Sequence, residues 1–182
     1  MRSSNFIAAA ILCGSIAVIF IVAFVNNKNY PIYVIAGESS VGTWASGVLL
    51  VVSATVALIF GMRRGWFPWS VISIFFLVLA LDERFMLHEA LKTKIILRYD
   101  LDPEHPALIA ELPVMIGALI GLAVTMVLWK KFHKTGKMLL AGAAAFGAAS
   151  VIIDIFTLGV MWEDTLKVVA EAMIACAFLS EA

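Results

Sequence analysis

Six long hydrophobic runs, separated by short polar segments, organise the chain. They cover Phe6–Val25, Gly42–Met62, Ser70–Glu89, Ala107–Trp129, Met138–Met161 and Asp164–Ser180. About 20 apolar residues are enough for a helix to cross the hydrocarbon core of a bilayer. The pattern therefore predicts an all-α fold, a polytopic transmembrane bundle of six helices that forms a single domain over residues 1–182.

The composition also favours a membrane protein. Hydrophobic residues make up 63% of the 182 residues and charged residues 14%, which would leave a water-soluble protein with more apolar surface than it can bury. We expect a multi-pass protein of the plasma membrane, the inner membrane of a bacterium, with membrane lipid as a partner and no nucleic acid. Neither Cys13 nor Cys176 lies in a metal-binding pattern, so both are expected to pack as small hydrophobic residues.

Lysine and arginine predict the orientation, because cytoplasmic loops carry an excess of them. With the N-terminus in the cytoplasm, four of these residues fall outside and seven fall inside: Arg2, Arg63, Arg64, Lys130, Lys131, Lys134 and Lys137. We therefore expect both termini to be cytoplasmic. Trp66, Trp69 and Trp129 would then belong to the aromatic belt on that side.

Six acidic residues fall inside the predicted spans: Asp82, Glu83, Glu89, Glu111, Asp154 and Glu171. Counted along four separate helices, all but Glu89 lie about 11–12 Å below the outer helix ends. Ionisable groups in a bilayer normally face one another or a wet cavity. We expect one outward-opening polar pocket, with His88 and Glu89 as its upper tier.

Two local features refine this pocket. Asp82 and Glu89 are seven residues apart and would share one face of a continuous helix. Pro113 is expected to kink the fourth span and to free a carbonyl group near Glu111.

The charge balance suggests a metal ion. Against six carboxylates the spans offer only Arg84 and Lys167 as permanent cations, so the remaining acids must be protonated or neutralised by bound metal. Carboxylates with an imidazole suit Zn, Fe or Mn, whereas Ca or Mg would suit the site if His88 is not a ligand. The predicted ligands of this divalent ion are Asp82, Glu83, His88, Glu89, Glu111, Asp154 and Glu171.

Structural roles are the alternative for several of these residues. Glu163, Lys167 and Glu171 have the i, i+4, i+8 spacing of an ion-pair ladder along one helix. Arg84 is expected to pair with a carboxylate, and the alternative for His88 is a hydrogen bond at the membrane interface. His133 is expected at the cytoplasmic surface.

Two segments, "LDERFMLHE" and "WEDTLKVVAEA", resemble a loosely defined group of uncharacterised bacterial multi-pass membrane proteins. Those proteins carry D-E-x(4)-H-E at the end of one span and an acidic E-E/D-x-x-E-like motif that opens the last. Lys167 occupies a position where that second motif has an acid. The resemblance implies no particular activity, and its matching residues are Asp82, Glu83, His88, Glu89, Glu163 and Asp164.

Three functions follow from these features. The first is a metal-binding membrane protein with its site in the outer leaflet, which leaves open whether the protein is an enzyme acting on a lipid or a small periplasmic molecule. The second is an accessory or structural subunit of a larger membrane complex, with other membrane subunits as partners. The third is a cation or proton transporter, because acids within a span are usual in such proteins.

Overall fold

The computed structural model of the chain describes residues 14, 40–101, 108–156 and 160–182. Within these ranges the protein consists of helices, with no strand. The predicted span Phe6–Val25 lies outside the described residues, apart from residue 14. The elements are α2 (Val41–Arg64), α3 (Trp66–Phe85), α4 (Leu87–Tyr99), the 3-10 helix η2 (Leu108–Glu111), α5 (Leu112–Lys131), α6 (Lys134–Ile155) and α7 (Val160–Glu181).

Four helical segments are long and apolar enough to cross a membrane: Val41–Arg64, Trp66–Phe85, Ile109–Lys131 and Lys134–Ile155. The sequence prediction of an all-helical protein with membrane spans is confirmed to this extent. The last helix, α7, is also long, but its first twelve residues include Glu163, Asp164, Lys167 and Glu171, and it is not among the four.

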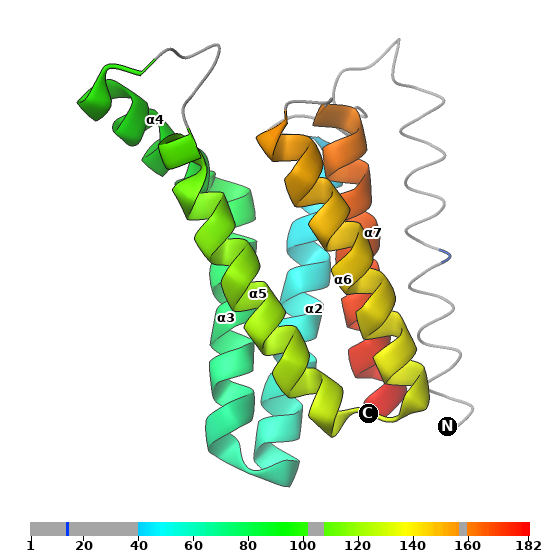
Figure 1. Ribbon diagram of the computed structural model, residues 1–182. Coiled ribbons are helices and arrows are strands. Elements are labelled where there is room, and N and C mark those ends of the chain that lie inside the picture. Colours follow the sequence, from blue (N-terminus) through cyan, green and yellow to red (C-terminus); the bar gives the residue numbers. More distant parts are fainter. Residues whose placement is uncertain (1–13, 15–39, 102–107, 157–159) are drawn as a thin grey trace.

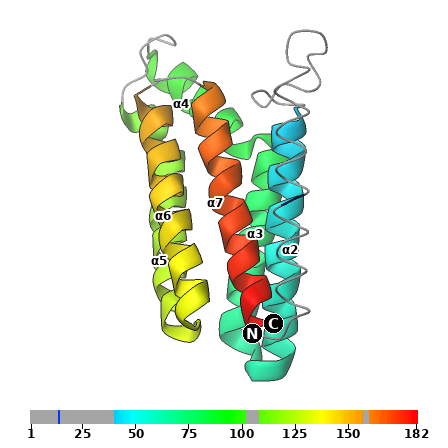
Figure 2. The same cartoon turned by 90° about the vertical axis from the view of Figure 1, so that its right-hand side faces the viewer.

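Two helical hairpins, α2–α3 and α6–α7, form the framework of the fold. They join because α7 packs against α2, which places α7 between α6 and α2 (Figure 2). Helix α5 runs alongside α6 (Figures 1 and 2). The short helix α4 leaves the bundle obliquely at its upper end in Figure 1.

The turn of the α2–α3 hairpin consists of Gly65 alone. Its φ is +116°, a conformation that side chains disfavour and glycine tolerates. The Gly65 N–H donates to the carbonyl oxygen of Gly61 and closes α2. The two helices are close here, because a Cβ on Gly61 would lie 3.3 Å from the Cβ of Trp69.

A cluster of aromatic side chains lies within the larger hydrophobic core. Phe178 is fully buried and contacts Trp69, Phe76 and Phe132, with ring centroids 5.3–6.5 Å apart and mostly edge-to-face. Such pairs contribute about 0.5–1.5 kcal/mol each beyond the burial of their area. Trp69 is only 2% exposed, so its expected place in the aromatic belt is wrong, and it is a core residue instead.

The two ends of the bundle differ in charge. The end with the α2–α3 and α5–α6 turns and the C-terminus (Figure 1) is called the basic end. It carries Arg63, Arg64, Lys130, Lys131, Lys134 and Lys137 in or beside those turns. The opposite end, where α3 passes into α4 and α6 ends, is called the polar end. The sequence correctly placed these basic residues together.

Two predicted helix features are wrong. The span Ser70–Glu89 is broken at Met86, which adopts the left-handed conformation with φ 50° and ψ 47°. Asp82 and Glu89 therefore lie on different helices and do not share a face. Pro113 lies in the first turn of α5 rather than in the middle of the helix. The missing N–H of a proline needs no partner at that position, so Pro113 starts the helix without kinking it.

Candidate functional site

The charged residues of the polar end gather at the ends of helices rather than at a common depth within them. Asp82 and Glu83 belong to the last turn of α3, Glu111 is the N-cap of α5, and Asp154 is the penultimate residue of α6. Glu171 is different, because it lies eleven residues into α7, about 16 Å along the axis. The predicted position about 11–12 Å below the outer helix ends is therefore wrong for Asp82, Glu83, Glu111 and Asp154, since these helices end or begin within the predicted hydrophobic runs.

Asp82 caps the start of α4 from across the break at Met86. One carboxylate oxygen accepts the backbone N–H of His88 and the other contacts His88 Nδ1, both at 2.8 Å. The first N–H groups of a helix have no partner inside it, so a carboxylate here satisfies a donor and opposes the helix dipole favourably. This contact stabilises the left-handed Met86 and fixes the orientation of the imidazole ring.

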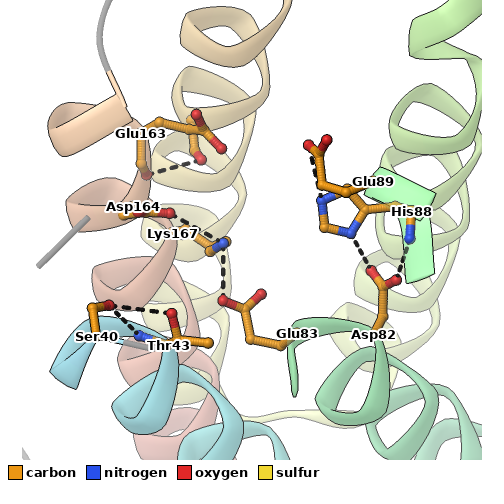
Figure 3. Close-up of polar contacts among 10 residues, drawn as sticks. Ser40, Thr43, Asp82, Glu83, His88, Glu89, Glu163, Asp164 and Lys167 are labelled. Carbon is orange, nitrogen blue, oxygen red and sulfur yellow. Dashed lines mark hydrogen bonds and ion pairs between the residues drawn. The ribbon is translucent and has the colours of Figure 1, made fainter. Parts of the chain in front are cut away.

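The other ring nitrogen of His88 faces Glu89. Its Nε2 lies 3.7 Å from Glu89 Oε1, which is too far for a hydrogen bond. The side chain of His88 is 30% exposed and that of Glu89 is 51% exposed. Asp82, His88 and Glu89 thus form one row of three groups with the imidazole in the middle (Figure 3).

Glu83, the neighbour of Asp82, points to a different partner. Figure 3 shows it reaching from α3 toward Lys167 on α7. The Lys167 Nζ lies 3.1 Å from Glu83 Oε1 and 3.3 Å from Asp164 Oδ1. The predicted ladder along α7 is therefore wrong, because Lys167 pairs across the helix interface and with Asp164 instead of with Glu163 and Glu171.

Glu171 is buried where α7 packs against α2. Its carboxyl group interacts with the hydroxyl of Ser46, which is fully buried on α2, although neither Glu171 Oε2 nor Ser46 Oγ makes a hydrogen bond of good geometry. The charge of Glu171 interacts with those of Glu83 and Lys167. A buried polar atom without a partner is costly, so this is the least satisfied part of the polar end.

Lys92 and Glu111 form the third contact of the polar end. Their side chains meet at 2.6 Å, with Glu111 only 6% exposed and its Oε2 without a hydrogen-bond partner. Burial lowers the pKa of Lys92, but the hydrogen bond and the charge of Glu111 raise it more, so the net pKa lies above its usual value. Lys92 therefore stays charged at neutral pH. Asp154 interacts electrostatically with Lys92, Glu111, Glu89 and His88.

The structure thus brings the seven predicted ligands to the polar end but distributes them over separate contacts. In the ranges that the structure describes, no three histidine, cysteine or acidic side chains are grouped closely enough to hold a metal ion. Arg84 is exposed on α3 and has no ion pair with a described residue, so the partner expected for it is not found.

The sequence did not predict a further polar contact, which lies at the basic end. Glu181 is 1% exposed and accepts the backbone N–H of His133 at 2.6 Å, while its other oxygen contacts His133 Nδ1 at 2.7 Å. His133 is the N-cap residue of α6, so this contact ties the end of α7 to the start of α6. The sequence feature that could have indicated this contact is Glu181 itself, an acidic residue at the end of the bundle where the turns are basic. His133 is 87% exposed, as expected for a surface residue.

Comparisons with known proteins place the chain in one family. No curated protein and no solved structure matches it. The match to a family model covers nearly the whole sequence, including every helix described above. The chain belongs to the family described as a domain of unknown function (DUF8692), whose model matches residues 6–182.

Proposed function

We propose that this protein is a six-span plasma-membrane protein with both termini in the cytoplasm, and that it binds a divalent metal ion at its polar end. His88 and Glu89 are the first ligands in this proposal, and Asp82 orients the histidine. The observation that carries it is the 3.7 Å separation of His88 Nε2 and Glu89 Oε1. Two ligand atoms bound tetrahedrally to one zinc ion lie about 3.4 Å apart.

The contact between Asp82 and His88 supports this assignment. A metal-bound histidine usually gives its other ring N–H to a carboxylate or carbonyl group, which fixes the tautomer and the direction of the ring. Asp82 lies 2.8 Å from Nδ1, so Nε2 is the nitrogen left for a ligand. An imidazole and a carboxylate together suit Zn, Fe or Mn better than Ca or Mg.

The charge balance of the polar end supports a cation in general. Eight acidic side chains belong to this region: Asp82, Glu83, Glu89, Glu111, Asp154, Glu163, Asp164 and Glu171. Among the described residues, only Lys92 and Lys167 form ion pairs with them as permanent cations. A bound divalent ion would become the largest positive charge in the site and would reduce the repulsion among these acids.

An ion held by His88 and Glu89 would need further ligands. Asp154 is the candidate for a third, because its charge interacts with those of both residues. Such an ion would still have an open position for water or a substrate oxygen, as catalytic metal sites do. A bound metal lowers the pKa of its water toward 7, so a metal-dependent membrane enzyme is the fuller form of this proposal.

The test is the metal content of detergent-purified protein, measured by elemental analysis after dialysis against each metal. We expect about one ion per chain in the wild type and loss of that ion in His88→Ala and Glu89→Gln. The matched control is His133→Ala, because His133 also contacts a carboxylate through its backbone N–H and Nδ1, but at the basic end. A wild type without stoichiometric metal, or equal loss in the control, would refute the proposal.

An accessory subunit is the second candidate, and α5 favours it. Leu128 is the one buried residue of this 20-residue helix, whereas α2 buries eleven. A membrane helix that packs so little on the part of the chain that the structure describes offers a face for another subunit as well as for lipid. Cysteine cross-linking from Leu119, 66% exposed, in native membranes would yield a discrete heterologous product in this case, and none if lipid covers the helix.

A further inference from the structure

Helix α4 has an exposed face that neither the metal proposal nor the bundle core uses. None of its residues is buried. Its less exposed side chains, including His88 and Lys92, lie on one face, toward η2 and α5. The opposite face carries Leu91, Lys94, Leu97 and Arg98, and all four are exposed.

This face combines leucines with cations. Leu91 is 49% exposed and Leu97 is 76% exposed. Lys94 and Arg98 are four residues apart, so their side chains lie next to each other on the helix. Neither has an ion-pair partner among the described residues, although acids are abundant elsewhere at the polar end.

The position of α4 identifies the medium around this face. The helix follows α3, a candidate membrane span, after a single left-handed residue, and it leaves the bundle obliquely at the level where α3 ends (Figure 1). A helix at this level lies at the boundary between hydrocarbon and headgroups. There leucines can enter the acyl region while lysine and arginine side chains extend to the headgroups.

We propose that Lys94 and Arg98 of α4 form a binding site for the headgroup of an anionic phospholipid, with Leu91 and Leu97 in contact with its acyl chains. The shared chemistry is a phosphate that accepts hydrogen bonds from an ammonium and a guanidinium group. This proposal requires the membrane location but no metal ion. It also places lipid on the same short helix that carries His88 and Glu89 in its first turn.

The test titrates purified protein in a neutral detergent with phosphatidylglycerol or phosphatidylcholine and counts the bound lipids by native mass spectrometry. We expect the wild type to prefer phosphatidylglycerol. In Lys94→Gln/Arg98→Gln the affinity for this lipid should fall by about 30-fold, as expected for two basic residues near an anionic surface. The affinity for phosphatidylcholine should not change.

Two further variants complete the test. Lys130→Gln/Lys134→Gln removes the same charge from exposed positions at the basic end and should keep the preference for phosphatidylglycerol. Lys94→Arg/Arg98→Lys keeps the charge of α4 and should bind like the wild type. The proposal is refuted if the wild type binds both lipids equally, or if the loss is the same in the basic-end variant. Metal content is independent of these outcomes.

Discussion

Replacement of Lys167 by Met tests whether the ion pair between α3 and α7 holds the polar end together. The Lys167 ammonium is the cation nearest to Glu83 and also contacts Asp164. The side chain of Glu83 is 12% exposed and that of Lys167 is 29% exposed. Without the lysine, two carboxylates would repel each other in a region of low water access, next to the buried Glu171.

The burial of the two side chains determines how much stability Lys167→Met should lose. Removing one partner of a fully buried pair costs about 3–5 kcal/mol, because the other charge is left without compensation. Water reaches part of Lys167, and protonation of the orphaned acids limits the loss. We therefore expect Lys167→Met to lower the free energy of unfolding by about 2 kcal/mol, less than the fully buried limit. Glu83→Gln/Lys167→Met should recover about half of this loss, since the double variant buries no unpaired charge at position 83.

The measurement is equilibrium unfolding in mixed micelles of SDS and dodecyl maltoside, followed by far-UV circular dichroism. Lys130→Met is the matched control, because it removes a lysine that is exposed at the basic end and should change stability by less than about 0.5 kcal/mol. Strictly additive effects of the two substitutions would show that Glu83 and Lys167 do not interact, and the assignment of this pair would then be wrong.

Two smaller substitutions probe the other contacts. A Cβ on Gly136 would lie 2.7 Å from Glu181 Oε1 and 3.0 Å from the ring of Phe132, so Gly136→Ala should destabilise the protein by about 1 kcal/mol through the lost cap. Gly147→Ala on the same helix, with 3.8 Å to its nearest neighbour, should stabilise it by up to about 1 kcal/mol. Equal effects in thermal unfolding would contradict the contact at Gly136. Ser46→Ala should destabilise the protein by about 1 kcal/mol, because the buried Ser46 hydroxyl interacts with the buried Glu171 carboxyl; unchanged stability would show that the two groups do not interact.

The hydrophobic pattern predicted the helices well where nothing interrupts them. The predicted span Gly42–Met62 agrees with α2 to within two residues at each end. Gly65 follows the last residue of α2, where a glycine is the usual residue to end a helix. Hydrophobicity alone locates such a segment, because lipid contact and helix packing both require apolar residues.

The polar end was harder to predict because side-chain contacts, rather than hydrophobic periodicity, determine where its helices end and begin. The sequence predicted one continuous span over Ser70–Glu89, but the Asp82 carboxylate accepts the backbone N–H of His88 at 2.8 Å, and a new helix begins at Leu87. A contact between residues six apart that forms only across a left-handed Met86 leaves no periodic signal. The sequence identified the residues that gather at this end but not which residue each one contacts.

Ion pairing on α7 was mispredicted for a related reason. The spacing of Glu163, Lys167 and Glu171 fits contacts along one helix, and such contacts contribute only about 0.2–0.5 kcal/mol each. A carboxylate from another helix gains more from the same lysine when both are largely shielded from water. The packing of α3 and α7 brings Glu83 to Lys167, and only the tertiary fold contains that information.

Adjacent residues at the end of α3 connect the two halves of the polar end. Asp82 holds the start of α4 through His88, and Glu83 holds α7 through Lys167. Successive residues of a helix point about 100° apart, so this one turn of α3 serves two partners on different sides. A ligand that binds His88 and Glu89 would add a contact on the Asp82 side without changing the pair on the Glu83 side. Metal binding and the stability of the α3–α7 interface should therefore respond to different substitutions, even though the two residues that support them are neighbours in the sequence.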